Sequence, residues 1–342
     1  MSRRTRVSLF LAVVLVVVGG VTAYAVGSAA DYRRTYERPP SVPTVSDAEE
    51  PAGPASGPRI VFRHTGIDDS YGRVASVRLD DPSGPRTVSD VSCDRVDATD
   101  EVTACLRTER GVVTTYSLTE YDAAWHELQR VPLPGIPSRT RLSADGAMVS
   151  ATTFVSGHDY LQVGFSTATE IRDVDGRGHG DLERFALVLD GERVTPRDRN
   201  VWGVTFADDD TFYATVGTGG RTYLVEGSLD ARTLTSVADH VECPSLSPDG
   251  TRIAYKEAST RDGATWWTPA VLDLATGERT VLDSEQASVD DQVEWLDDDT
   301  LLYGLPREGE AGSTDVWALD ARGSAGPRLL IPLAWSPAVV RP

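Results

Sequence analysis

The sequence predicts an all-β protein, a six-bladed β-propeller over residues 59–342, preceded by one N-terminal transmembrane or signal helix over residues 1–30. Three observations predict it. A motif recurs about every 40–64 residues, near the ~40–45 residues of a four-stranded propeller blade. Beyond residue 30, no apolar pattern has the period of a helix. Residues 7–30 carry no charge, and such a stretch is long enough to cross a membrane.

The repeat is clearest at residues 244–255, where Leu246 precedes Ser-Pro-Asp-Gly and then the apolar run Ile253-Ala-Tyr255. The Asp-Gly pair supplies a positive-φ turn between two strands, and the apolar run is a short buried strand. Third and fourth strands follow, separated by a turn with Asp273 and Gly277. The positions that match Leu246 elsewhere are Val96, Leu142, Phe206, Trp295 and, in a truncated copy, Trp335.

Blade 1 lacks a first strand of its own, because residues 60–62 already have the pattern of a second strand. The C-terminal segment 333–337 has a first-strand pattern and no further blade-forming segment after it. We therefore expect residues 333–337 to pair beside residues 60–62. This pairing closes the ring and removes an open sheet edge.

The run Leu246-Ser-Pro-Asp-Gly-Thr-Arg-Ile-Ala-Tyr255 resembles the repeat of the TolB-type, WD40-like six-bladed propellers. The resemblance covers roughly residues 59–342 and is greatest to TolB-like, membrane-anchored proteins of actinobacteria. It implies a propeller fold and a binding function, with no catalytic residue. Periplasmic TolB has an α/β domain before its propeller, where this chain has a proline-rich segment. The resemblance therefore does not imply the Tol–Pal translocation role.

The N-terminal segment predicts where the protein resides. Arg3, Arg4 and Arg6 precede the uncharged stretch, and this order predicts a cytoplasmic N-terminus with the remaining chain outside. The alternative is a cleaved signal peptide, for which the small residues around Ala25 and Ala30 offer cleavage sites. The protein is thus expected in the cell membrane, with a single pass and an extracytoplasmic C-terminal domain, or secreted if the signal is cleaved.

Residues 31–58 are rich in proline and polar residues, which predicts an extended extracytoplasmic linker.

The charge of the chain limits its partners. The chain has 52 acidic and 33 basic residues and a formal net charge of −19. A nucleic acid partner is excluded, because such binding depends on basic groups that neutralise phosphates.

Three cysteines suit an oxidising compartment. Residues 93–96 and 102–105 have the pattern of two short strands around a loop. If these strands pair as a hairpin, Cys93 lies opposite Cys105 at a distance that a disulfide can bridge. We expect that disulfide, with Cys243 unpaired and buried. The alternative is two small buried thiols.

Three loops, at residues 155–166, 258–267 and 306–314, are candidate binding sites, because long loops on rigid scaffolds often carry function. An insertion at residues 155–166 explains most of the long spacing between Leu142 and Phe206. The candidate side chains are His158, Tyr160 and Phe165 in this insertion, and Trp266 and Trp267 in the fifth blade. The tryptophan pair can equally begin a strand, with one ring in the core.

The segment 173–181 has acids and a glycine spaced as in some calcium loops. The weak calcium candidates are Asp173, Asp175 and Asp181. Arg177 stands where an oxygen ligand is required, so a polar turn is the favoured interpretation. The acidic triplets at 208–210 and 297–299 are interpreted as solvated turns, with a shared cation as the alternative. No other cofactor or metal is expected.

We expect no enzymatic activity, since the chain has neither a Gly-x-Ser-x-Gly elbow nor a cysteine with a nearby histidine. Two functions remain. The first is a membrane-tethered scaffold that binds an envelope protein or peptide, favoured by an apolar rim of loops. The second is a small-ligand or glycan binder that uses the central channel, favoured by a deep polar pocket at the channel mouth.

Overall fold

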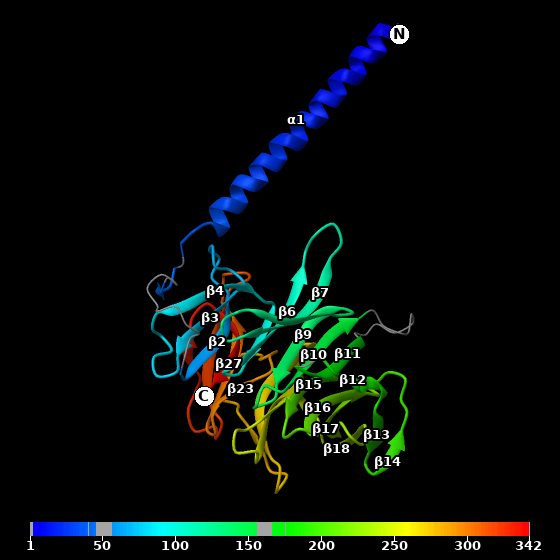
Figure 1. Ribbon diagram of the computed structural model, residues 1–342, viewed down its shortest axis with the longest axis vertical. Coiled ribbons are helices and arrows are strands. Elements are labelled where there is room, and N and C mark those ends of the chain that lie inside the picture. Colours follow the sequence, from blue (N-terminus) through cyan, green and yellow to red (C-terminus); the bar gives the residue numbers. More distant parts are fainter. Residues whose placement is uncertain (1–2, 40, 46–56, 156–165, 175, 342) are drawn as a thin grey trace.

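The computed structural model describes residues 3–39, 41–45, 57–155, 166–174 and 176–341. Six sheets, antiparallel except for the pairs β1–β4 and β13–β18, stand around a common axis as the blades of a propeller, and one long helix projects from the ring (Figure 1). The predicted fold class is therefore confirmed. The first, innermost strands of the blades surround the central channel, and the fourth strands lie at the rim.

The strands of each blade follow in order from the axis outwards. Blade 1 contains β27 (Ala334–Val340), β2 (Arg59–His64), β3 (Arg73–Arg78), β4 (Arg86–Ser92) and the short β1 (Thr44–Val45). Blade 2 contains β5 (Arg95–Ala98), β6 (Val102–Glu109), β7 (Thr115–Asp122) and β8 (Glu127–Pro132). Blade 3 contains β9 (Ile136–Leu142), β10 (Met148–Val155), β11 (Ser166–Asp173) and β12 (Gly178–Asp181).

Blade 4 contains β15 (Asn200–Phe206), β16 (Thr211–Thr218), β17 (Arg221–Ser228) and β18 (Thr233–Asp239), followed by β13 (Ala186–Leu189) and β14 (Glu192–Val194). Blade 5 contains β19 (Glu242–Leu246), β20 (Arg252–Arg261), β21 (Ala264–Asp273) and β22 (Arg279–Val281). Blade 6 contains β23 (Glu294–Asp297), β24 (Thr300–Pro306), β25 (Thr314–Asp320) and β26 (Arg328–Ile331).

The core lies between adjacent blades, so the second strands are covered on both faces. In β20, Ile253, Ala254 and Tyr255 are fully buried, as the continuous apolar run predicts. The preceding turn requires a left-handed residue, which Gly250 supplies with a φ of 71°. The Asp-Gly motif thus specifies the turn, and the apolar run specifies the buried strand.

The predicted ring closure is present, with a different register. β27 pairs antiparallel with β2, but Ala338, Val339 and Val340 are the residues opposite Val61, Ile60 and Arg59. Trp335 lies opposite Arg63, beyond a register shift. Ser336 has a φ of 54°, which produces a bulge at this point. The alignment of Trp335 with Leu246 is therefore wrong. Val339, opposite Ile60, has the position that Leu246 has opposite Ile253 in blade 5.

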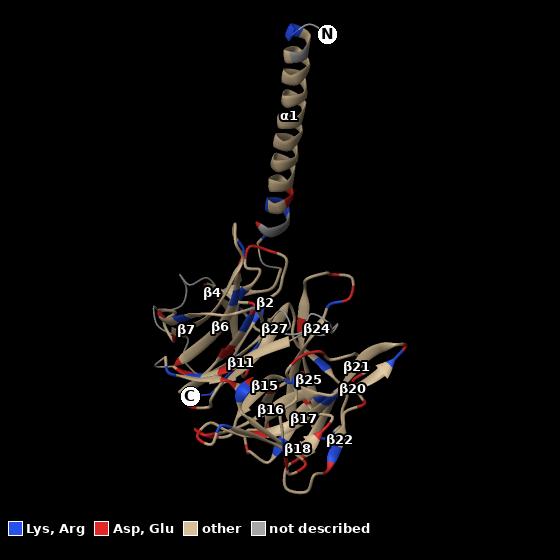
Figure 2. Cartoon of the chain, turned by 90° about the vertical axis from the view of Figure 1, so that its right-hand side faces the viewer, with Lys and Arg blue, Asp and Glu red and all other residues tan. Residues whose placement is uncertain are grey.

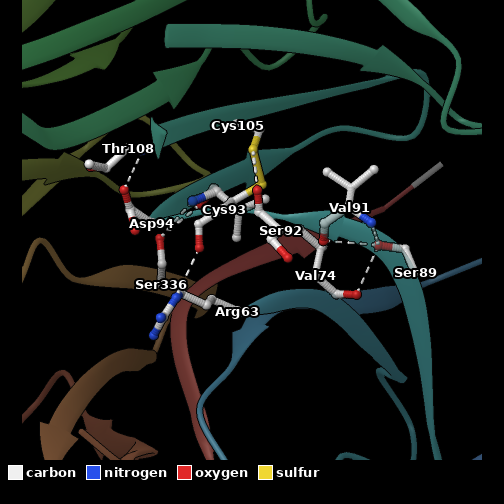
Figure 3. Close-up of a disulfide and its surroundings, with 11 residues drawn as sticks. Arg63, Val74, Ser89, Val91, Ser92, Cys93, Asp94, Cys105, Thr108 and Ser336 are labelled. Carbon is white, nitrogen blue, oxygen red and sulfur yellow. Dashed lines mark hydrogen bonds between the residues drawn. A yellow bond between two sulfur atoms is a disulfide. The ribbon is translucent and has the colours of Figure 1, made fainter. Parts of the chain in front are cut away.

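The disulfide between Cys93 and Cys105 is present, with Cα atoms 5.4 Å apart (Figure 3). The predicted reason for it was wrong, because Cys105 lies opposite Val96 in the β5–β6 hairpin. Cys93 instead follows the end of β4, in the connection from blade 1 to blade 2. The bond therefore joins that connection to the second strand of blade 2. Cys243 is free and buried, as expected.

The long spacing between Leu142 and Phe206 has a second source besides the insertion. After β12 the chain forms a 3₁₀ turn, η1 (Leu182–Arg184), and then the β13–β14 hairpin. β13 pairs parallel with β18 and widens blade 4 at its rim. The attribution of most of the spacing to residues 155–166 was therefore wrong. Residues 156–165 lie outside the described part of the chain.

The helix α1 (Arg3–Tyr36) is uncharged along most of its length and has charged residues at both ends (Figure 2). It continues six residues into the segment expected to be a linker. Two residues beyond it, the carbonyl of Arg38 accepts a hydrogen bond of 3.0 Å from the amide of Asp69. Asp69 lies in the loop between β2 and β3. The loops that join the second strand of a blade to its third strand all lie on one face of the ring. We call this the helix face and the opposite one the distal face.

Candidate functional site

The candidate site is a funnel where the central channel opens on the distal face. Its cavity of about 640 Å³ lies within the range of ligand pockets. Innermost strands and the turns that follow them form its wall. The polar and charged residues of the wall include Asp97, Asp100, Glu101, Arg141, Ser143, Asp145, Thr205, Ser245, Ser247, Asp249, Glu294 and Arg341. Six carboxylates thus face two guanidinium groups.

Three of these charges form the floor of the funnel. The Arg141 guanidinium donates a hydrogen bond to Glu294 and lies 4.0 Å from an oxygen of Asp97. The other Asp97 oxygen accepts a 2.6 Å hydrogen bond from the amide of Leu142. Burial, reinforced by the charge of Glu294, raises the pKa of Asp97 to about 7 despite the opposing effect of Arg141. The floor is therefore fixed by interactions within the protein.

The rim carries the carboxylates that an incoming ligand meets first. Glu101 and Asp249 are exposed. Hydrogen bonds from Ser247 and Thr251 lower the pKa of Asp249 to about 2 and keep it ionised. Asp145 has the equivalent position in blade 3, and a hydrogen bond from Ser143 lowers its pKa. The rim therefore presents negative charge from three blades at neutral pH.

Below the floor the channel is nearly filled. Arg95 donates to Asp291 at 3.0 Å, and its guanidinium stacks 4.8 Å from the centre of the Trp335 ring. The Gln292 side chain donates to the carbonyls of Val204 and Pro244, from two other blades. The remaining cavity is about 20 Å³, room for roughly one water molecule. A ligand can thus enter the funnel but not pass through the ring here.

The raised pKa of Asp97 predicts a pH dependence. The folded state holds the Asp97 proton up to about pH 7, whereas the unfolded state releases it near pH 3.9. Between these values the folded state binds more protons, so rising pH destabilises it. For Asp97→Asn, the free energy of unfolding relative to the parent should therefore increase from pH 4 to 7. Urea denaturation at several pH values measures this. A constant difference, or one that decreases, would contradict it, and exposed Asp230→Asn is the control.

The tryptophan pair lies away from the funnel, in the β20–β21 hairpin near the helix face. Both rings are half-buried. The Trp267 ring contacts the Lys256 ammonium at 4.5 Å, and its Nε1 donates to Glu242. Trp266 stacks with Arg261 at 4.0 Å. Their role as a binding loop stays a prediction. His158, Tyr160 and Phe165 lie outside the described residues.

The carboxylates of the calcium candidate that the structure describes have partners within the protein. Asp173 contacts Nε2 of His179 at 2.6 Å, and Asp181 accepts from the amide of Glu183. Asp175 lies outside the described residues. Within the described ranges, no group of three or more His, Cys, Asp or Glu side chains could hold a metal ion. A calcium site at 173–181 stays a weak prediction.

No protein-family model matches the sequence, and no curated protein is significantly similar to it. Solved structures are similar. TolB from Acinetobacter baumannii has a TM-score of 0.55 at 17% identity, over 84% of this chain and 67% of that one. A protein from Agrobacterium tumefaciens assigned to TolB has a TM-score of 0.47 at 10% identity, over 80% and 88% of the two chains.

The expectation that the chain is not an enzyme, made from its missing nucleophile motifs, is contradicted, because enzymes are among the similar structures. A puromycin-hydrolysing peptidase from Mycobacterium tuberculosis is similar over 87% of this chain and 57% of its own, with 13% identity and a TM-score of 0.43. The similar structures also include an oligogalacturonate lyase in complex with manganese. The fold of this chain is that of a TolB-like six-bladed β-propeller.

Proposed function

We propose that the protein is a membrane-tethered, extracytoplasmic scaffold whose funnel binds a positively charged segment of a partner protein in the cell envelope. The TolB-like propeller supports a protein-binding scaffold of the envelope in general. The single observation that carries the finer proposal is the funnel, an open cavity with carboxylates around its rim.

The charges of the funnel favour a cationic ligand. Arg141 is already paired with Glu294 on the floor, and Arg341 donates to the carbonyl of Leu296. Glu101, Asp145 and Asp249 are exposed on separate blades, and Asp249 also lies 3.8 Å from the Arg252 guanidinium. Charges spread around a ring attract several cationic groups at once, as a peptide with several Arg or Lys residues offers. A single small cation would neutralise the carboxylates on only one side of the rim.

A second candidate is a small ligand or glycan in the channel. The polar cavity at the channel mouth is the feature that favours this function. Its volume suits a small molecule as well as a few peptide residues. The peptide is preferred because the exposed carboxylates of the rim lie in the turns of three separate blades.

The location outside the cytoplasm rests on two features. α1 has an apolar stretch long enough to span a membrane, and none of it is buried against the propeller. The Cys93–Cys105 disulfide is typical of oxidising compartments. A retained helix gives a single-pass membrane protein, and cleavage gives a secreted one.

Selection of peptides from a random library on the purified full chain tests the proposal. We expect enrichment of Lys- and Arg-rich peptides, with affinity that falls as salt increases. The variant Glu101→Gln/Asp249→Asn should weaken binding, because it removes two negative charges from the rim. Each amide keeps the shape of the side chain and an acceptor oxygen, so the change tests charge alone. The matched control Asp209→Asn/Asp230→Asn removes two exposed charges of the distal face outside the funnel. Equal loss in both variants, or enrichment of neutral peptides, would refute the proposal.

A further inference from the structure

The β6–β7 hairpin of blade 2 ends in an apolar tip. Outside α1, Val112 and Val113 are the most exposed large apolar side chains in the described structure, at 108% and 74%. They follow the exposed Arg110 and Gly111. Exposed neighbouring valines at the end of a rigid hairpin have no packing function in the propeller itself. Such residues commonly mark a contact with a protein or a membrane.

The tip lies on the helix face. It connects second and third strands, as does the loop that holds Asp69, which is bonded to Arg38 just beyond α1. Figure 1 shows the β6–β7 hairpin rising from the ring on the side of α1. Ile136 and Phe154 are cross-strand partners at the same face of blade 3 and are 55% and 40% exposed.

The short connection brings this face close to the bilayer. Residues 31–36 extend α1 beyond its apolar stretch by roughly 9 Å at ~1.5 Å per residue. The headgroup layer on each side of a bilayer is about 5–8 Å thick. Arg38 and its partner Asp69 therefore lie near the outer boundary of the headgroups. With α1 across the membrane, loops of the helix face that extend beyond Asp69 towards α1 are within reach of lipid.

We propose that residues 110–113 insert into the interface of the same membrane that α1 crosses, so that lipid is the partner of this tip. Valine side chains suit the boundary between headgroups and acyl chains, and Arg110 is attracted to anionic lipid headgroups. The acidic distal face is repelled by the same surface. Two contacts, α1 and the tip, hold the ring with its funnel directed away from the membrane. This inference rests on the tethering in the proposed function.

The tip needs only a weak intrinsic affinity for lipid. Because α1 keeps it beside the bilayer, insertion is an intramolecular step with a high effective concentration. Two valines and one arginine are too few to bring a free protein to a membrane, but they suffice to orient a tethered one.

Fluorescence quenching in nanodiscs tests the orientation. The full chain is placed in nanodiscs of phosphatidylcholine and phosphatidylglycerol that contain a nitroxide-labelled lipid. An environment-sensitive fluorophore is attached to one introduced cysteine, at Thr114→Cys beside the tip, Asp31→Cys at the end of the apolar stretch, or Asp209→Cys on the distal face. Cys243 is buried and Cys93 is bonded to Cys105, so the introduced thiol is the reactive one.

We expect quenching at positions 114 and 31 and none at 209. Adding Val112→Glu/Val113→Glu should abolish the quenching at 114 and leave that at 31, and both changes are at exposed positions that leave the core intact. Quenching at 31 but not at 114, or at 114 regardless of the glutamates, would overturn the inserted tip alone. Absence of quenching at position 31 would refute the tethering and, with it, this inference.

Discussion

Deleting residues 333–342 should abolish the folded propeller. The segment supplies β27, the first strand of blade 1, whose backbone pairs with β2. Without it the cluster of Ile60 and Phe62, both fully buried, loses the packing that β27 supplies through Ala334 and Val339. Each backbone group left buried without a partner costs ~1–3 kcal/mol, while total stability is typically about 5–15 kcal/mol. Loss of a whole strand therefore exceeds the stability available.

Circular dichroism and thermal denaturation measure this effect. The truncated chain should lack a cooperative transition and accumulate in aggregates through the open edge of β2. Deletion of residues 341–342 alone is the matched control, because it leaves every residue of β27 in place. A truncated chain that melts within a few degrees of the parent would show that β27 does not close the ring.

Replacing both bonded cysteines, in Cys93→Ser/Cys105→Ser, should lower the free energy of unfolding by about 3 kcal/mol, the chain-entropy value for a loop of roughly 15 residues. The two residues are 12 positions apart. The bond fixes the connection from blade 1 to blade 2, beside the closing strand: Ser336 in β27 donates to the carbonyl of Val96. Its loss frees the first interblade connection.

Urea denaturation of parent and variant gives this difference. Addition of a reductant should destabilise the parent to about the level of the variant and leave the variant unchanged. A variant as stable as the oxidised parent would show that the bond contributes nothing to folding.

The sequence predicts the propeller well because the blades repeat one local motif. The motif consists of an apolar position in the first strand, a turn, and a buried apolar run in the second strand. The motif is clearest at Leu246, Gly250 and residues 253–255. As predicted, Leu246 lies in the first strand, Gly250 in the turn and residues 253–255 in the buried second strand. The register of β27 could not be predicted in the same way. Trp335 has the residue type of an anchor, and only the positive φ of Ser336 shifts pairing to Val339.

The floor of the funnel was missed, although the repeat contains a sign of it. Arg141 and Glu294 directly precede the apolar positions Leu142 and Trp295, and Asp97 directly follows Val96. Aligned blades therefore place charges beside the channel. The pairing of Arg141 with Glu294 could not be predicted, because it depends on the distance across the channel between the first strands of blades 3 and 6. The residues predicted for binding were aromatic side chains of loops instead, and Trp266 and Trp267, the two among them that the structure describes, lie away from the funnel.

The central claim is that the funnel holds a basic segment of an envelope protein, and photocrosslinking in intact membranes tests it most directly. A photoreactive amino acid replaces Ala207, which lines the funnel and is exposed. We expect adducts with an Arg- or Lys-rich segment of one extracytoplasmic protein. Their yield should fall in Glu101→Gln/Asp249→Asn and persist in Asp209→Asn/Asp230→Asn. Adducts with acidic or neutral segments, or equal yields in both variants, would contradict the claim.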